Sequence, residues 1–510
     1  MAQVSKKNNT IAKNTLFLYL RMFFVLGVSL YTTRVVFNVL GVVDYGIYNV
    51  VSGFVLLFSF LNTSLANGVQ RYYNYSIGRK GEYSVTDVYN MSLLIQLIFG
   101  VVLVLVIELG GLWYMDHYMT IPAERLVAAK WVFHTGVLSL FLVIMQIPYS
   151  AAVIAYEKMD YYAVVNIVDV VARLVAIIVL PCIDVDKLAL YGCLLLMINV
   201  LDLAMYAGYC KLQFDGIVLA LKFRSKLFRD MLVFSGWNIF GTFSFMLQSQ
   251  GMNLLLNGWF GPVLNAARGV ANMVQAAVQG FQGNIVLAFR PQIVQSYAEG
   301  DYERVREMFN WLSKISYVML LVIITPLTLE LHQVLEFWLG DKVPEETYIF
   351  TTLVLVNTLI SSLNTPVTQV IHATGRMKLY QIAVGTIICM SLPVAWLLLK
   401  MGCEPYSVFV VCILFTLINQ IVSIMVLRRY FAIDIRKYVS GIIIPLLVVT
   451  VLTPVAGWYL CQVMDETFLR LVIVGAVSVC MCLALSYYVL LNGAERRVIV
   501  SFIQNKIRKS

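Results

Sequence analysis

One stretch of the sequence carries polar side chains at a spacing that suits ligand binding inside a membrane. After the turn at 257–262, one cation and four amides recur within an apolar run: Arg268, Asn272, Gln275, Gln279 and Gln282. On an α-helix this spacing places all five on one stripe. Lipid offers such groups no partner, so they must face water, a polar substrate or a neighbouring helix. Five in register favour the wall of a polar cavity.

Further charged and polar side chains interrupt other apolar runs. Asn238 and Gln248 precede the stripe, Arg21 lies in the first run, and Asp169, Arg173 and Asp202 lie in two later ones. A charge at bilayer depth costs about 2.5–3.5 kcal/mol and normally faces a cavity or another charge. Asp169 and Arg173, four residues apart, are equally explained as a structural ion pair, and Asp202 as a helix bridge. Arg21 and Arg268 have no acidic residue nearby in sequence, which favours a substrate anion as their partner.

Signatures of enzymes and metal centres are lacking in the sequence. It contains neither a Gly-x4-Gly-Lys-Ser/Thr phosphate loop nor a His-Glu-x-x-His zinc helix. The nine cysteines lie mostly in apolar runs without ligand spacing. Asp184 and Asp186 form an Asp-x-Asp pattern, which is frequent by chance and falls in a short turn. We therefore expect no catalytic residue, no metal and no cofactor, and a protein that is not an enzyme.

The composition is that of a multi-pass membrane protein. Of 510 residues, 60% are hydrophobic and 13% charged, and the mean hydropathy is +0.82; soluble domains carry about 25% charged residues. Apolar runs of the length of a bilayer predict about fourteen transmembrane helices. Most of the 37 lysines and arginines fall on the N-terminus and every second connection. The positive-inside rule then places both termini in the cytoplasm. No connection is long enough for a soluble domain.

The chain also repeats itself at a separation of about 220 residues. Matching positions include Arg71 with Arg290, Gly81 with Gly300, Tyr83 with Tyr302 and Asn90 with Asn310. An even number of spans separates the copies, which predicts parallel lobes around a central cavity. We expect an all-α protein with an N-terminal lobe at 1–230 (six spans), a C-terminal lobe at 231–430 (six spans), and two additional spans with a basic cytoplasmic tail at 431–510.

Several short motifs resemble those of a known transporter family. They are Leu40-Gly41-x3-Tyr45-Gly46-x-Tyr48, the Gly261-Pro262 turn, Pro291, and Tyr297-Ala298-Glu299-Gly300-Asp301. With two parallel lobes, they resemble the Wzx-like polysaccharide flippases of the multidrug/oligosaccharidyl-lipid/polysaccharide exporter superfamily. The resemblance implies alternating access in the bacterial inner (cytoplasmic) membrane. It implies transfer of an undecaprenyl-pyrophosphate-linked oligosaccharide to the outer leaflet for surface polysaccharide such as O-antigen, with membrane lipids and no nucleic acid as partners. It also suggests that the last two spans accommodate the lipid tail.

The polar residues fit that substrate. Guanidinium groups bind phosphate oxygens in a bidentate manner, so we assign the pyrophosphate to Arg21 and Arg268, assisted by Arg173. The amides would then line the sugar path, and Asp169 or Asp202 would couple transport to a proton or sodium ion. A cation-coupled multidrug antiporter of the same superfamily is the alternative, although organic cations favour a cavity rich in carboxylates. A membrane-embedded polymerase or ligase usually needs a large outward domain, which this chain lacks.

Overall fold

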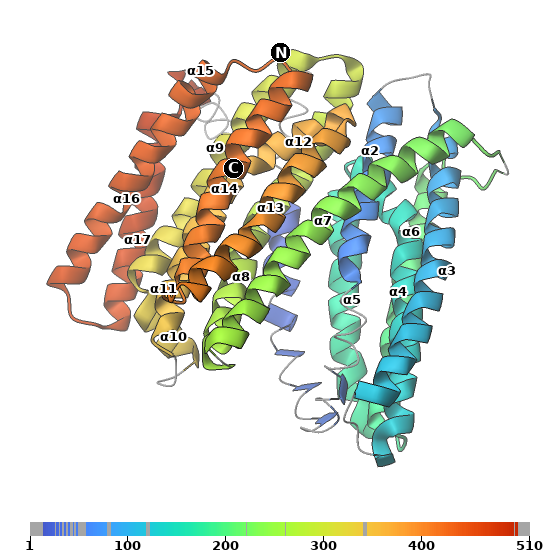
Figure 1. The fold of residues 1–510 in the computed structure, drawn as a ribbon. Helices are drawn as coiled ribbons and strands as arrows, with labels where there is room; N and C mark the ends of the chain where they lie inside the picture. Colours follow the sequence, from blue (N-terminus) through green and yellow to red (C-terminus); the bar gives the residue numbers. More distant parts are fainter. Residues whose placement is uncertain are drawn as a thin grey trace, which may run out of the picture. The chain divides into compact units, whose positions relative to one another are not determined.

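The computed structural model is all-helical over the part of the chain that it describes (Figure 1). That part comprises residues 14–25 and 58–497, interrupted at 79–82, 119–122, 221, 261, 340–343 and 494, with short stretches between 27 and 48. Most of the Leu40–Tyr48 motif, with Gly81 and Gly261, therefore lies outside the described residues. So does much of the second expected span.

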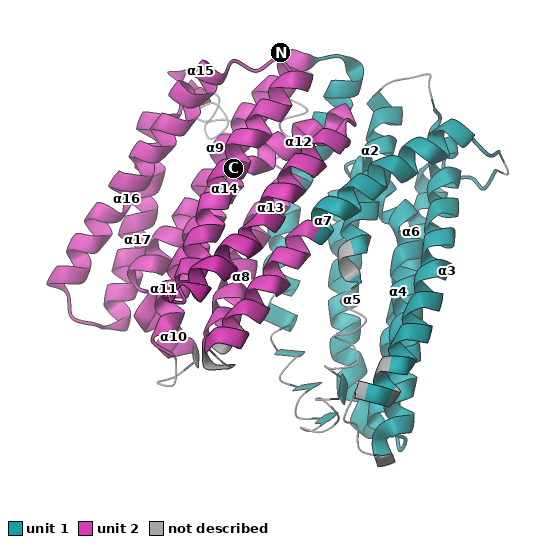
Figure 2. Ribbon diagram, viewed as in Figure 1, with its two compact units in different colours: residues 1–243, 287–301 teal, residues 244–286, 302–510 magenta. Residues whose placement is uncertain are grey.

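The helices form two compact units (Figure 2). Unit 1 comprises residues 1–243 and 287–301, and unit 2 comprises residues 244–286 and 302–510. Two long helices, α7 (Ser225–Phe260) and α8 (Pro262–Glu299), contribute to both. The lobes expected at 1–230 and 231–430, with the appendage 431–510, remain a prediction.

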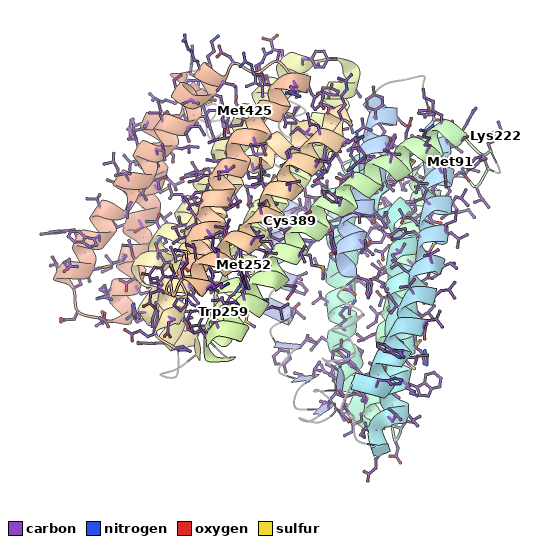
Figure 3. The ribbon with its side chains drawn as sticks, in the orientation of Figure 1. Met91, Lys222, Met252, Trp259, Cys389 and Met425 are labelled. Atoms are coloured by element: carbon purple, nitrogen blue, oxygen red, sulfur yellow. The ribbon has the colours of Figure 1, made fainter. Side chains whose placement is uncertain are left out.

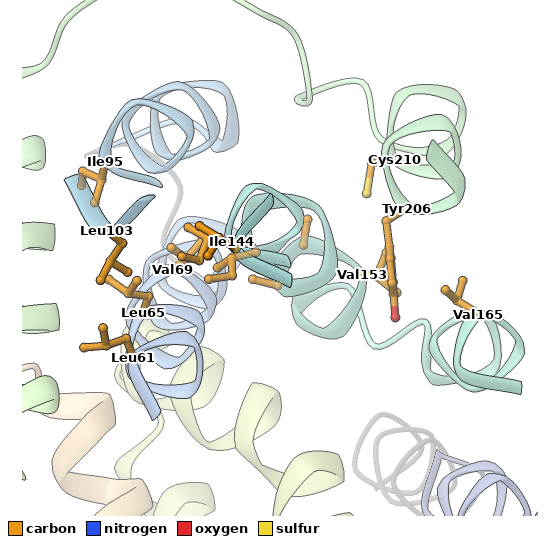
Figure 4. Close-up of a cluster of buried hydrophobic side chains, with 14 of the residues drawn as sticks. Leu61, Leu65, Val69, Ile95, Leu103, Ile144, Val153, Val165, Tyr206 and Cys210 are labelled. Atoms are coloured by element: carbon orange, nitrogen blue, oxygen red, sulfur yellow. The ribbon is translucent and has the colours of Figure 1, made fainter. Parts of the chain in front are cut away.

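Unit 1 is built from helices that pack through small and aromatic side chains. Besides a helix over Asn14–Ser29, its elements are α2 (Ser59–Gly78), α3 (Val85–Tyr118), α4 (Leu126–Ala155), α5 (Met159–Val179) and α6 (Lys187–Gln213). Gly192 lets α6 approach α4 closely, since a Cβ atom there would lie 2.6 Å from the Thr135 hydroxyl. The apolar core of the unit runs from Leu65 and Ile144 to Tyr206 (Figure 4).

Unit 2 adds nine further α-helices and two π-helical turns among the described residues. They are α9 (Tyr302–Leu329), α10 (Leu331–Leu339), α11 (Glu346–Ser362), α12 (Asn364–Thr374), α13 (Met377–Lys400), α14 (Ser407–Tyr430), α15 (Ile435–Tyr438), the π-helix Val439–Ile443, α16 (Ile444–Val463), α17 (Phe468–Leu485) and the π-helix Ser486–Leu490. Gly300 connects α8 to α9 in the left-handed region, with φ 82°. A glycine adopts that conformation without a Cβ clash.

The described helices include nine that are long and apolar enough to cross a membrane, or ten if the bent pair α11 and α12 counts as one span. Large apolar side chains on their outer faces are exposed, for example Val102, Leu105 and Leu109 on α3 and Val451 on α16. The chain is therefore a multi-pass membrane protein, and the expected count of about fourteen spans is compatible with it. Helices α7 and α8 are long enough to span but are not among the nine, because polar residues interrupt them.

Candidate functional site: two amide rows, a buried arginine and a carboxyl pair

The predicted polar stripe lies on α8, where it separates into two rows. Gln275 donates a hydrogen bond to the Thr358 hydroxyl of α11 (2.9 Å), and Gln282 donates one to the Thr365 hydroxyl of α12 (3.0 Å). The two glutamines are seven residues apart, and so are the two threonines in the same order. Helix α8 therefore runs parallel to the bent helix pair α11 and α12. Seven residues are about two turns of helix, which keeps the row nearly parallel to the axis. This row, here called the bonded row, joins helices.

The second row, here called the open row, consists of Asn272 and Gln279, which are also seven residues apart. Asn272 is partly exposed and Gln279 is exposed. Glycines lie on either side of this row along the helix, Gly269 before it and Gly283 after it. A Cβ atom added at either glycine would meet no atom within 4 Å. Amide groups beside a glycine-rich face leave room for a ligand to approach the helix backbone. The amides of the bonded row thus form hydrogen bonds to neighbouring helices, whereas those of the open row are available to a ligand.

Arg268 begins the stripe and is buried in the apolar core of unit 2, with 6% of its surface exposed. Its guanidinium lies 5.7 Å from the ring centre of Phe409, and its Nη2 donates to the backbone carbonyl of Ser249 (3.1 Å). Met252, labelled in Figure 3, belongs to the same core. The Nε and Nη1 atoms have no acceptor among the described residues. A buried cation without a carboxylate is costly, so this side chain is suited to bind an anion.

Unit 1 contains the predicted carboxylates. The Nε atom of Arg173 lies 2.8 Å from Asp169 Oδ1, so the ion pair on α5 is formed. Asp202 of α6 is 7% exposed, and its Oδ1 accepts no hydrogen bond from a described residue. Its carboxyl lies close enough to that of Asp169 for the two to interact. Arg173 pairs with Asp169, so Asp202 is the buried carboxyl that a proton or a metal cation would stabilise.

Arg21 belongs to unit 1 and stands against α5. Its Nη1 donates to the Asn166 side-chain oxygen (3.2 Å), and its guanidinium lies 5.3 Å from the ring centre of Tyr162. Asn166 is held in turn by its own hydrogen bond to the Tyr162 carbonyl (2.7 Å). The residue is part-buried. A guanidinium packed on an aromatic ring keeps its charge and can add an anionic ligand.

The two polar residues of α7 differ in their surroundings. Gln248 donates to the Ser391 hydroxyl of α13 (2.7 Å) and so joins two helices of unit 2. Asn238 is buried in unit 1, where its backbone carbonyl accepts a hydrogen bond from Thr242. A substrate role of either residue remains a prediction, as it does for the rest of the predicted site.

The structure also shows polar contacts formed by two arginines that the hydropathy pattern places in loops. Arg290 lies within α8 and donates to the side-chain oxygen of Asn67 on α2. Its repeat partner Arg71 packs its guanidinium 5.0–5.4 Å from three aromatic ring centres, those of Tyr72, Tyr75 and Phe234. The signal in the sequence was the repeat itself, which pairs these two arginines. Among the described residues no group of three or more His, Cys, Asp or Glu side chains is placed to hold a metal ion.

The fold is that of known transporters, although comparison of the sequence alone finds no relative. No protein-family model and no curated protein matches the sequence. Among solved structures, a MATE protein in the bent conformation matches with TM-score 0.73 at 13% identity, covering 83% of this chain and 95% of that one. An outward-facing MATE multidrug resistance transporter of the MOP superfamily matches with TM-score 0.72 at 13% identity, over 83% and 95%.

A third structure widens the comparison. It is a MOP superfamily transporter from Pyrococcus furiosus, described as having a binding pocket of reverse polarity that suggests a different function. It matches with TM-score 0.68 at 12% identity, covering 82% of this chain and 95% of that one. The chain is thus a multi-pass helical membrane protein with the fold of the MATE transporters of the MOP superfamily.

Proposed function

We propose that the protein is a flippase that moves an undecaprenyl-pyrophosphate-linked oligosaccharide from the cytoplasmic to the outer leaflet by alternating access. The fold supports a transporter, since its structural neighbours are transporters. The choice of an anionic, sugar-bearing substrate rests on the polar residues of this chain. We further propose that it acts in the bacterial inner membrane, with both termini in the cytoplasm, in surface polysaccharide synthesis.

The observation that carries the proposal is the environment of Arg268. It is a buried cation whose Nε and Nη1 atoms lack an acceptor among the described residues. Both atoms are N–H donors of a cationic group, and charge-assisted hydrogen bonds from guanidinium to phosphate oxygens are strong. On the same stripe, the open row of Asn272 and Gln279 offers amide donors and acceptors that suit sugar hydroxyls. An organic cation would find repulsion at Arg268 instead.

The direction of transfer agrees with the charge of the substrate. An inside-negative membrane potential favours outward movement of negative charge by about 2.3 kcal/mol per charge per 100 mV. In this scheme the guanidinium groups of Arg268 and Arg21, with that of Arg173, bind the pyrophosphate. Each guanidinium stabilises the head group while it is out of water, which is the costly part of a flipping cycle.

A second observation favours coupling to a cation. Asp202 is buried beside the Asp169 carboxyl with an oxygen that accepts no described hydrogen bond. We propose that this carboxyl pair takes up a proton or a sodium ion during the cycle. The same pair is what a cation-coupled multidrug antiporter needs, and such an antiporter is the second candidate function.

Lipid-linked oligosaccharides extracted from cells that lack the protein distinguish the two functions. The flippase proposal expects completed cytoplasm-facing intermediates to accumulate, and wild type to relieve the accumulation. Arg268→Gln is expected to fail, since a neutral amide replaces the cation. Arg429→Gln, an exposed arginine at the end of α14, is the matched control and is expected to complement. Absence of accumulation, together with raised sensitivity to cationic dyes, would instead support the antiporter.

A further inference from the structure

A polar pocket of about 720 Å³ lies at the end of unit 2 where α9 begins and α14 ends. This size is typical of small-molecule sites, which span roughly 300–1,000 Å³. Four basic and two acidic side chains line it: Arg306, Lys314, Arg428, Lys437, Asp434 and Glu495. None of them belongs to the stripe of α8 or to the carboxyl pair of unit 1.

Two of these charges neutralise each other in a buried ion pair. Lys314 Nζ lies 2.7 and 2.8 Å from the oxygens of Glu495, and the two side chains are 7% and 12% exposed. Glu495 also accepts a hydrogen bond from the backbone N–H of Asn492 (2.8 Å). This pair therefore fixes the segment after α17 onto α9 and leaves little charge to act on a ligand.

The remaining charges make the pocket positive. Asp434 accepts hydrogen bonds from the backbone N–H groups of Arg436 and Lys437, so its carboxylate caps α15. The Lys437 ammonium is 3.9 Å from it and 88% exposed, which is a weak pairing. Arg306 contacts the Ala432 carbonyl, and Arg428 is exposed. Neither arginine forms an ion pair with a carboxylate of the described residues.

An apolar groove of about 360 Å³ adjoins the pocket, with Lys314 in the wall of both. Side chains of α9, of α17 and of the π-helix that follows α17 line it, among them Trp311, Ile315, Val318 and Leu483. Such a groove at the end of two membrane helices is shaped for a hydrocarbon chain, whereas a soluble anion has no use for it.

Both π-helical turns among the described residues contribute to these walls. Val439–Ile443 supplies two residues of the pocket, and Ser486–Leu490 supplies three residues of the groove. The Arg496 guanidinium donates to the carbonyls of Tyr487 (3.0 Å) and Tyr488 (2.6 Å) that the second turn leaves free. Insertions of this kind are frequent at functional sites because they widen a helix at one point.

We propose that the pocket and the groove together bind one anionic phospholipid of the surrounding leaflet. Arg306, Arg428 and Lys437 hold its phosphate, and one acyl chain lies along α9 and the last helix. A zwitterionic lipid is disfavoured, because its own cation would enter a pocket that is already positive. This lipid is not the transported substrate, and the site stands whichever substrate the protein carries.

The test uses the full-length protein in phosphatidylcholine nanodiscs that contain a small fraction of brominated lipid. Bromine on an acyl chain quenches tryptophan on contact, and the difference from Trp311→Phe isolates the residue that lines the groove. Brominated phosphatidylglycerol is expected to quench Trp311 more than brominated phosphatidylcholine at equal fraction. Arg428→Gln is expected to lower the phosphatidylglycerol preference about fivefold, the usual effect of one cation at a lipid surface.

Arg429→Gln is the matched control, because Arg429 is exposed on the next position and does not line the pocket. It is expected to keep the wild-type preference. Equal quenching by both lipids in wild type, or equal losses in both variants, would overturn the proposal. Displacement of brominated phosphatidylglycerol by millimolar inorganic phosphate would overturn the lipid assignment and identify a site for free phosphate.

Discussion

Two glutamines on the same stripe of α8 are expected to respond differently to replacement by leucine. Gln275 belongs to the bonded row and reaches the Thr358 hydroxyl, whereas Gln279 belongs to the open row and is exposed. The residues are four positions apart and chemically identical. Replacing each in turn therefore separates a role in helix packing from a role in substrate contact.

The expected size of the packing effect follows from what the lost amide leaves behind. The Thr358 hydroxyl also donates to the Val354 carbonyl (2.8 Å), so it keeps a partner in Gln275→Leu. The variant then loses one interhelical hydrogen bond, which in membranes contributes about 0.6 kcal/mol and at most about 1.7 kcal/mol. Gln279→Leu removes no hydrogen bond of the described residues, so its unfolding free energy is expected to stay within about 0.5 kcal/mol of wild type.

Two assays on the same variants give the comparison. Unfolding in denaturing detergent measures stability, and accumulation of lipid-linked oligosaccharide in complemented cells measures flipping. Gln275→Leu is expected to lower stability slightly and retain flipping, while Gln279→Leu keeps stability and impairs flipping. The reverse pattern, with transport lost in Gln275→Leu and intact in Gln279→Leu, would refute the division into two rows.

Three further predictions concern charged groups elsewhere in the chain. Glu330→Gln breaks a buried ion pair with Arg470 (2.8 Å; 2% and 9% exposed). Arg470 keeps Glu466 (3.3 Å) and the Met464 carbonyl as partners, so the unfolding free energy is expected to fall by about 1.5–3 kcal/mol, the contribution of one hydrogen bond to a charged group. A loss below about 1 kcal/mol would show that the pair is not formed. Asp202→Asn is expected to leave the amount of folded protein unchanged and to abolish the dependence of flipping on a proton or sodium gradient in proteoliposomes; an unaltered dependence would remove Asp202 from the coupling site. Partial burial alone would raise the pKa of Asp186, but the Ala189 N–H and the Arg125 guanidinium outweigh it and hold the pKa below its ordinary value. The ionised carboxylate therefore stabilises the fold above pH about 4, and this stabilisation is lost as the pH falls through the lowered pKa. Thermal unfolding measured against pH is expected to show this loss in wild type and not in Asp186→Asn.

Much of the architecture follows from hydropathy and periodicity alone. An apolar content of 60% with 13% charge admits no soluble fold of this length, and the all-helical structure confirms the predicted fold class. The stripe on α8 was predictable because its spacing is a property of one helix. Its division was not, because the partners Thr358 and Thr365 lie far along the chain and no local pattern points to them.

The sequence also did not predict where the long helices α2 and α8 end. Hydropathy treats Arg71 and Arg290 as loop residues, since charge normally marks the membrane boundary. In the structure α2 and α8 continue past their apolar parts, and both arginines lie within helices. Each also contacts a residue of another helix, Phe234 of α7 for Arg71 and Asn67 of α2 for Arg290. Tertiary packing therefore decides where such a cation goes.

The central claim is that Arg268 recognises the pyrophosphate of a lipid-linked sugar. The most direct measurement compares the affinity of the purified protein in nanodiscs for an undecaprenyl-pyrophosphate oligosaccharide and for the same oligosaccharide on uncharged undecaprenol. Wild type is expected to prefer the pyrophosphate, and Arg268→Gln to lose about 10–100-fold of that preference, because a hydrogen bond to a charged group contributes about 1.5–3 kcal/mol. An equal affinity of wild type for both lipids, or an unchanged preference in Arg268→Gln, would contradict the account.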